Sequence, residues 1–140
     1  MCSRLNEKHS VRLSIRHPSI ASEVITEAMG VRPTHAWTMG APKVTPTGWP
    51  LSGIYPDTRW NYVLNSGNGD NLSEFLEKII ALIKEKTAFL KEIRAESGSV
   101  GVTVSLHGKV HSGNVITYTI LEALAVAQVD LGIEVFPNWN

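Results

Sequence analysis

Apolar and polar residues alternate near the N-terminus, which is the pattern of a strand with one buried face. The apolar residues are Val11, Leu13 and Ile15, and the polar ones are Arg12, Ser14 and Arg16. His17-Pro18 ends this predicted strand, and Ser19 is expected to cap a helix that follows. The apolar face of that helix consists of Ile20, Ala21, Val24, Ile25, Ala28 and Met29, and Gly30 supplies the left-handed residue at its C-terminal end.

Residues 31–53 contain four prolines and are predicted to form an irregular loop. Trp37 and Trp49 add large apolar surface to this loop, so we expect it to pack on the rest of the fold. A second strand is predicted at residues 58–64. Its two faces consist of Trp60, Tyr62 and Leu64 on one side and Arg59, Asn61 and Val63 on the other.

The second half of the chain predicts three helices and two strands. Helical spacing is strongest in residues 72–83, where Asn71 and Glu74 resemble a capping box, and Thr87 is expected to begin a short second helix. Alternation predicts strands at residues 100–106 and 131–135, with a helix at residues 115–127 between them.

This order of elements predicts the α+β class, as a two-layer sandwich of one mixed or largely antiparallel sheet with its helices packed on one face. Residues 10–15 and 99–104 are similar and each precedes a helix, which indicates two related strand-helix units side by side. Residues 1–9 are expected to form a flexible arm, and residues 10–140 a single domain.

Composition narrows the functional classes. Thirteen basic and thirteen acidic residues balance in 140 residues, which argues against nucleic acid and anionic membranes as partners. The single cysteine, Cys2, excludes an intrachain disulfide and a cysteine-based zinc cluster, and no run approaches the ~20 apolar residues of a membrane span. We therefore expect a cytoplasmic protein.

Several segments resemble the bacterial family called domain of unknown function 4279. They are residues 25–33, the turn at residues 37–40, the helix at residues 72–83, and the segments 121–124 and 129–136. The resemblance extends over about residues 10–136. Met39 stands where that family often has a basic residue, and Gly132 where an acidic residue is common. The resemblance implies no established activity, cofactor or catalytic residue.

One group of residues is a candidate binding site: His35, Trp37, Trp49, Arg59 and Trp60. Aromatic faces beside a cation and an imidazole suit a small pocket or a partner-binding surface. The ordinary alternative is that the tryptophans only cover the open face of the sheet. Arg12 and Arg16 share the outer face of the first strand with Ser14, where solvent, an acidic partner or another strand would meet them.

Other motifs predict no chemistry. His107 and His111 flank a loop and lack the further ligands of a zinc site, so no metal is expected. Residues 66–69 match no phosphate-binding pattern, and Asp70 disfavours an anion there. No nucleophile motif occurs, so we expect no cofactor and assign no catalytic residue.

The first functional hypothesis is a noncatalytic binding module for a protein partner or a small ligand, and one version, by analogy, neutralises or regulates a partner protein. The second is an enzyme for a small polar metabolite, with His35 as acid or base and Arg59 as anion clamp. A homodimer formed through an exposed strand edge is compatible with either.

Overall fold

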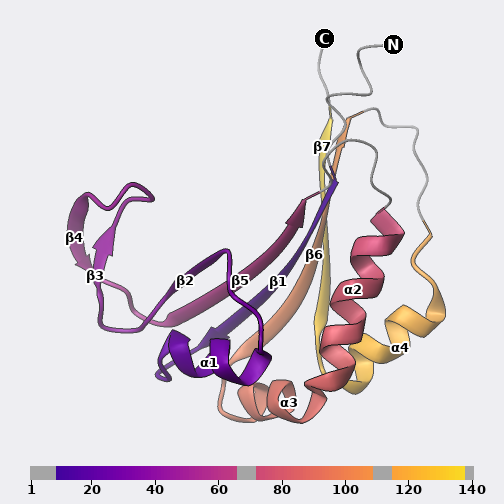
Figure 1. The fold of residues 1–140 in the computed structure, drawn as a ribbon, viewed down its shortest axis with the longest axis horizontal. Helices are drawn as coiled ribbons and strands as arrows, with labels where there is room; N and C mark the ends of the chain where they lie inside the picture. The colour runs from indigo at the N-terminus through magenta and orange to yellow at the C-terminus, as the bar shows by residue number, and fades with distance from the viewer. Residues whose placement is uncertain (1–8, 66–71, 109–114, 138–140) are drawn as a thin grey trace.

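Five strands form a mixed sheet in the computed structural model, which describes residues 9–65, 72–108 and 115–137 (Figure 1). Their order across the sheet is β2-β5-β1-β6-β7. Their bounds are β1 His9–His17, β2 His35–Trp37, β5 Thr58–Asn65, β6 Ser99–Gly108 and β7 Asp130–Pro137. The central strand β1 is antiparallel to β5 and β6, whereas β7 is parallel to β6. A parallel pair needs a crossover, and helix α4 provides it.

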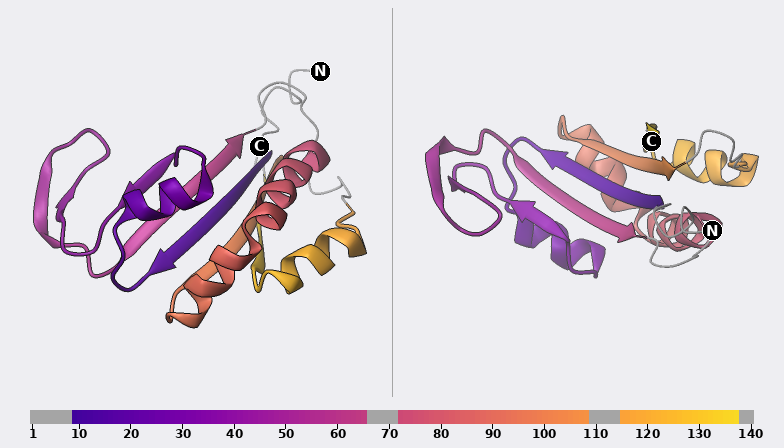
Figure 2. Two further views of the ribbon diagram at one scale, coloured as in Figure 1. Left: turned by 60° about the horizontal axis from the view of Figure 1, so that its bottom comes forward. Right: turned by 90° about the horizontal axis from the view of Figure 1, so that it is seen from above.

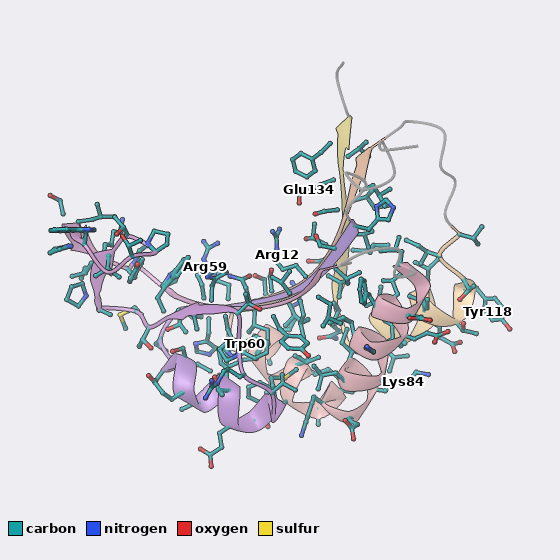
Figure 3. The ribbon with its side chains drawn as sticks, turned by 45° about the horizontal axis from the view of Figure 1, so that its top comes forward. Arg12, Arg59, Trp60, Lys84, Tyr118 and Glu134 are labelled. Atoms are coloured by element: carbon teal, nitrogen blue, oxygen red, sulfur yellow. The ribbon has the colours of Figure 1, made fainter. Side chains whose placement is uncertain are left out.

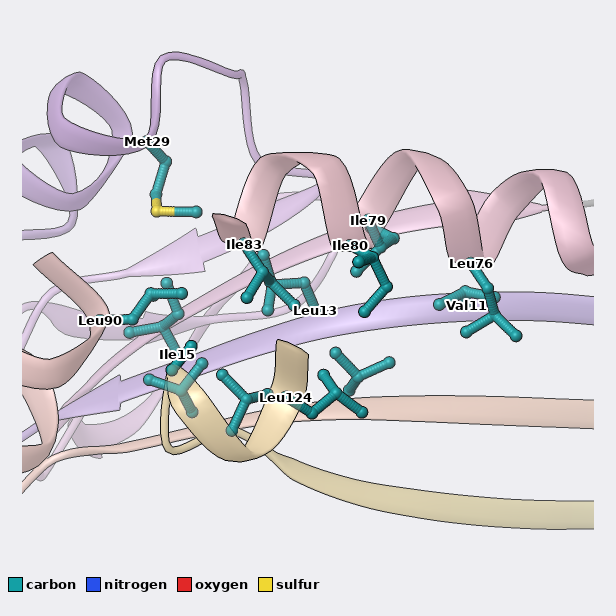
Figure 4. Close-up of a cluster of buried hydrophobic side chains, with 14 of the residues drawn as sticks. Val11, Leu13, Ile15, Met29, Leu76, Ile79, Ile80, Ile83, Leu90 and Leu124 are labelled. Carbon is teal, nitrogen blue, oxygen red and sulfur yellow. The ribbon is translucent and has the colours of Figure 1, made fainter. Parts of the chain in front are cut away.

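The helices all lie on one face of this sheet, which confirms the predicted α+β class (Figure 2). They are α1 Ser22–Met29, α2 Leu72–Glu85, α3 Thr87–Ala95 and α4 Tyr118–Val126. Val11, Leu13 and Ile15 of β1 are fully or almost fully buried beneath them, beside Ile79 and Ile83 of α2 (Figure 4). The opposite face of the sheet carries the polar residues of the alternating pattern, and none of the four helices within the described residues lies over it. We call it the open face.

The interpretation of residues 31–53 as an irregular loop was wrong. This segment contains β2, and a hairpin of β3 Pro42–Val44 and β4 Pro50–Ile54 that projects beyond the sheet (Figure 1). Two of its prolines are the first residues of β3 and β4, where a missing N–H group is tolerated. Gly48 turns the chain at a φ of 93°. We refer to residues 42–54 as the hairpin.

The start of α1 also differs from the prediction. Ala21 is the N-cap residue and Ser19 is not, because the helix begins at Ser22, whose N–H group donates to Thr38 Oγ1 at 3.0 Å. The N–H groups of Ser19 and Ile20 donate to His17 Nδ1 at 2.9 and 3.0 Å. Val24, placed on the apolar face from its spacing, is 50% exposed. Gly30 does end the helix in the left-handed conformation, at a φ of 74°.

Other boundaries shift by a few residues. His9 belongs to β1 and not to an arm, and α4 begins at Tyr118 instead of residue 115. The two predicted strand-helix units lie side by side only through their strands, because β1 pairs with β6. Their helices pack elsewhere, since α1 contacts β5 and α4 contacts β7. The predicted cap at Asn71, residues 66–70 and His111 lie outside the described residues.

Candidate functional site

Residues from five strands share the open face in rows fixed by the register of the sheet. Figure 3 shows Arg12, Arg59 and Glu134 on this face and Trp60 on the helix side. One cross-strand row contains His35, Asn61, Ser14, Gly101 and Asp130 in that order. The middle of this row has short side chains or none, whereas Arg12 and Arg16 flank Ser14 along β1. The register therefore predicts a depression between two arginines.

A hollow of about 570 Å³ lies at this position. Its lining includes Arg12, Ser14, Arg16, His35, Arg59, Asn61 and Gly101. Ser14 Oγ donates to Asn61 Oδ1 at 2.7 Å, which orients the amide group of Asn61 in this lining. We call this site the polar hollow.

Arg16 and Arg59 are direct cross-strand partners and share one carboxylate. Asp57 accepts from Arg16 Nε at 2.7 Å and from Arg59 Nε at 3.1 Å, with Arg59 Nη2 at 3.3 Å. The Asp57 side chain is only 10% exposed, whereas those of Arg16 and Arg59 are 40% and 50% exposed. The hydrogen bond from Arg59 lowers the pKa of Asp57, burial opposes this, and Arg16 lowers the pKa further. Asp57 thus stays ionised and holds both guanidinium groups in place.

Arg12 has a weaker partner on the other side of the polar hollow. Arg12 Nη2 lies 3.8 Å from Glu134 Oε1, an oxygen that also accepts from Ser105 Oγ at 3.0 Å. Both charged side chains are more than 40% exposed, so solvent screens this contact. The guanidinium group of Arg12 can therefore turn toward a ligand at little cost.

A second hollow of about 650 Å³ lies between β2 and the hairpin. Trp37 and Tyr55 stack in its wall with ring centroids 4.8 Å apart and an angle of 17° between their planes. Val44, Pro46 and Leu51 add further apolar lining from the hairpin. We call this site the apolar hollow. It shares His35, Trp37 and Arg59 with the polar hollow, so these three residues form a ridge between the two.

Comparison with known proteins gives a family and nothing more specific. A protein-family model described as Domain of unknown function (DUF4279) matches residues 7–136. The chain belongs to the DUF4279 family. Searches of curated proteins and of solved structures found no match. In this DUF4279 protein the match includes every strand and helix described above except the last residue of β7.

The structure divides the five predicted site residues of this DUF4279 protein. His35, Trp37 and Arg59 come together at the ridge. Trp60 is completely buried on the helix side, where its Nε1 donates to Thr26 Oγ1 at 3.0 Å. Trp49 is 72% exposed on the hairpin and lines neither hollow. The alternation in residues 58–64 places Trp60 and Arg59 on opposite faces of the strand, and this is the sequence signal that separates Trp60 from the site.

The sequence interpretation did not include Arg12, Arg16 and Asp57 in the site. The alternation places the two arginines on the outer face of β1 but leaves open whether solvent, an acidic partner or another strand meets them. The sequence also offers no pattern that joins Asp57 to Arg16, 41 residues earlier. Of the two departures from the family pattern, Met39 lines neither hollow, and Gly132 is the cross-strand neighbour of Thr103.

The described residues contain no group of three or more histidine, cysteine, aspartate or glutamate side chains placed to hold a metal ion. None of the helices within the described ranges has the length and apolar character needed to cross a membrane.

Proposed function

We propose that this DUF4279 protein is a noncatalytic binding module that holds a small anionic ligand in the polar hollow. The observation that carries the proposal is the Arg16–Asp57–Arg59 cluster, in which one carboxylate serves two guanidinium groups. A bacterial cytosolic setting belongs to the same proposal and agrees with the single cysteine of the chain.

Charge favours an anion over a neutral or cationic ligand. Like charges directly opposite each other on neighbouring strands destabilise a sheet. Asp57 compensates one of the two arginines and leaves one positive charge in this cluster. An anion between Arg16 and Arg59 would complete the neutralisation, and guanidinium groups bind carboxylates and phosphates through two parallel hydrogen bonds.

The size and pre-formed geometry of the polar hollow favour a small molecule over a protein partner. Small-ligand sites occupy roughly 300–1,000 Å³, a range that includes the 570 Å³ of this hollow. Its arginines come from regular strands, and Asp57 fixes two of them before any ligand binds. Little conformational entropy is therefore lost on binding.

Citrate, at constant ionic strength, is the probe for this proposal, and an assigned amide NMR spectrum is the readout. We expect citrate to shift amide signals around Ser14, Asn61 and Gly101. Gly101→Leu should fill the hollow, because a Cβ at this position meets nothing closer than 3.7 Å. We expect it to weaken citrate binding at least about tenfold, and Arg12→Ala to weaken it severalfold.

Arg32→Ala is the matched control, because Arg32 is also exposed and lines neither hollow. It should leave citrate binding unchanged. Equal weakening by Arg32→Ala and Arg12→Ala, or equal shifts with sodium chloride alone, would contradict a specific site.

An enzyme remains the second candidate, because His35 and Arg59 line the same two hollows. A general base is normally oriented by a third group. Within the described residues, no side chain hydrogen-bonds the His35 imidazole, which favours binding over catalysis. Chemical conversion of a ligand that binds in the polar hollow would instead support the enzyme, if His35→Gln abolishes that conversion.

A further inference from the structure

We infer that the ligand is an amphiphilic organic anion, whose carboxylate or phosphate group lies in the polar hollow while its apolar part lies in the apolar hollow. This inference rests on the anion site proposed above and adds the chemistry of the rest of the ligand. It follows from the way the two hollows are joined and from how differently they are lined.

The two hollows are neighbours that share the lining residues of the ridge, His35, Trp37 and Arg59. Each has the volume of a small-ligand site, at about 570 and 650 Å³. A ligand that crosses the ridge contacts Arg59 with its anionic end and the indole of Trp37 with its apolar end. One molecule can therefore use both hollows at once.

The apolar hollow leaves apolar side chains in contact with water. Val44 and Leu51 are 45% and 53% exposed, and Pro46 lies beside them in the lining. The stacked pair of Trp37 and Tyr55 presents flat aromatic surface to the same space. Covering these groups with an alkyl or aryl part of a ligand is favourable, because it removes apolar area from water.

The hairpin that forms the outer wall is closed at its base by hydrogen bonds between the residues on either side of it. Tyr55 N donates to Ala41 O at 3.0 Å, and Gly40 N donates to Tyr55 O at 2.9 Å. The Tyr55 hydroxyl group also lies 3.3 Å from both the N and the O of Val44. These bonds hold Tyr55 against the hairpin, and Tyr55 stacks on Trp37 of β2. Both walls of the apolar hollow are therefore linked through Tyr55 before a ligand enters it.

The charges around the apolar hollow suit an anion and disfavour a cation. Lys43 and Arg59 are among its lining residues. The one acidic residue in the lining, Asp57, already accepts hydrogen bonds from Arg16 and Arg59. An amphiphilic cation would meet these basic groups without a free carboxylate. A carboxylate or phosphate near the ridge would meet complementary charge.

Three compounds that share a four-carbon chain test the inference. 4-Phenylbutyrate carries a phenyl group and a carboxylate, butyrate only the carboxylate, and 4-phenylbutanol only the phenyl group. Binding is measured by amide NMR titration at constant ionic strength, with the indole N–H signals of Trp37 and Trp60 followed separately. We expect 4-phenylbutyrate to bind at least about tenfold more tightly than either other compound, since only it carries both an anionic group for the polar hollow and an aryl group for the apolar hollow. The Trp37 signal should shift, and the buried Trp60 signal should not.

Strand β4 offers a matched pair of variants. Leu51 lines the apolar hollow and Ile54 does not, although they are similarly exposed at 53% and 60%. Leu51→Ser should weaken 4-phenylbutyrate binding about tenfold and leave butyrate binding unchanged. Ile54→Ser should change neither.

The outcomes separate this inference from the anion site on which it rests. Equal affinities for butyrate and 4-phenylbutyrate would overturn the inference and leave the anion site standing. Equal losses from Leu51→Ser and Ile54→Ser would also overturn it. If 4-phenylbutanol binds as tightly as 4-phenylbutyrate and neither carboxylate shifts signals around Ser14 and Gly101, the anion site itself is wrong and the inference fails with it.

Discussion

Trp49 and Trp60 have the same side chain and opposite surroundings. Trp60 is fully buried, 6.3 Å from the ring of Tyr62, whereas Trp49 is 72% exposed. We expect Trp60→Ala to lower the free energy of unfolding by about 3–5 kcal/mol, because it leaves a cavity in the core. Trp49→Ala should change it by less than about 0.5 kcal/mol. Urea denaturation measures both, and equal losses would show that Trp49 also packs in the folded protein.

Asp57 links the charge of the site to the stability of the fold. Its pKa is lowered in the folded protein, mainly by the hydrogen bond from Arg59, from an ordinary value of 3.8. A lowered pKa stabilises the folded state above the unfolded value, and this stabilisation is lost as the pH falls through the folded value. Asp57→Asn should therefore cost about 1.5–3 kcal/mol near neutral pH, and the cost should shrink as the pH falls below 3.8.

Asp130→Asn is the control for that experiment. Asp130 also pairs with an arginine, Arg94, but its side chain is 77% exposed. Replacing it should have only a small effect on stability at any pH. A gap between the wild type and Asp57→Asn that stays constant down to pH ~3 would contradict the role assigned to the Asp57 charge.

At the scale of elements, the junction between α3 and β6 requires a residue without a side chain. A Cβ on Gly98 would lie 2.5 Å from the backbone oxygen of Arg16 and 2.8 Å from that of Ile93. Gly98→Ala must therefore move the backbone, and we expect it to lower the free energy of unfolding by at least about 1–3 kcal/mol. Gly101→Ala, with its nearest atom at 3.7 Å, should be neutral or slightly stabilising. Equal thermal midpoints for the two variants would contradict this.

The hairpin shows why an element can escape prediction. Its prolines and glycines are typical of loops, and its strands show no buried face, since every residue of β4 is exposed. Backbone hydrogen bonds form it instead, such as Thr45 N to Trp49 O at 2.8 Å. Hydrophobic alternation arises from burial, so a hairpin that buries neither face lacks this signal.

At the scale of the whole molecule, backbone protection should follow the order of the sheet. β1 has a hydrogen-bonded neighbour on both sides and its apolar face lies in the core. We expect its amides at residues 11–15 to exchange with deuterium slowest, through global unfolding. The amides of Thr45 in the hairpin and of Tyr55 directly after it should exchange faster, on the order of a hundredfold or more, because two exposed strands open locally. Equal protection would show that the hairpin opens only with the rest of the fold.

The sequence by itself determined the α+β class, most of the strands and helices, and the face of β5 on which Trp60 lies. Each of these follows from a periodicity of two or 3.6 residues, which records whether one side of an element is buried. It also indicated the three residues of the ridge, His35, Trp37 and Arg59.

Only the tertiary structure decided that Arg16, Asp57 and His35 belong to one site. Periodicity shows which face of a strand is polar, but not which strand lies beside it or in what register. The order β2-β5-β1-β6-β7 joins segments distant in the chain, and its register places Arg16 opposite Arg59. The polar hollow exists because strands far apart in sequence pair there, and this pairing depends on the packing of the whole core beneath them.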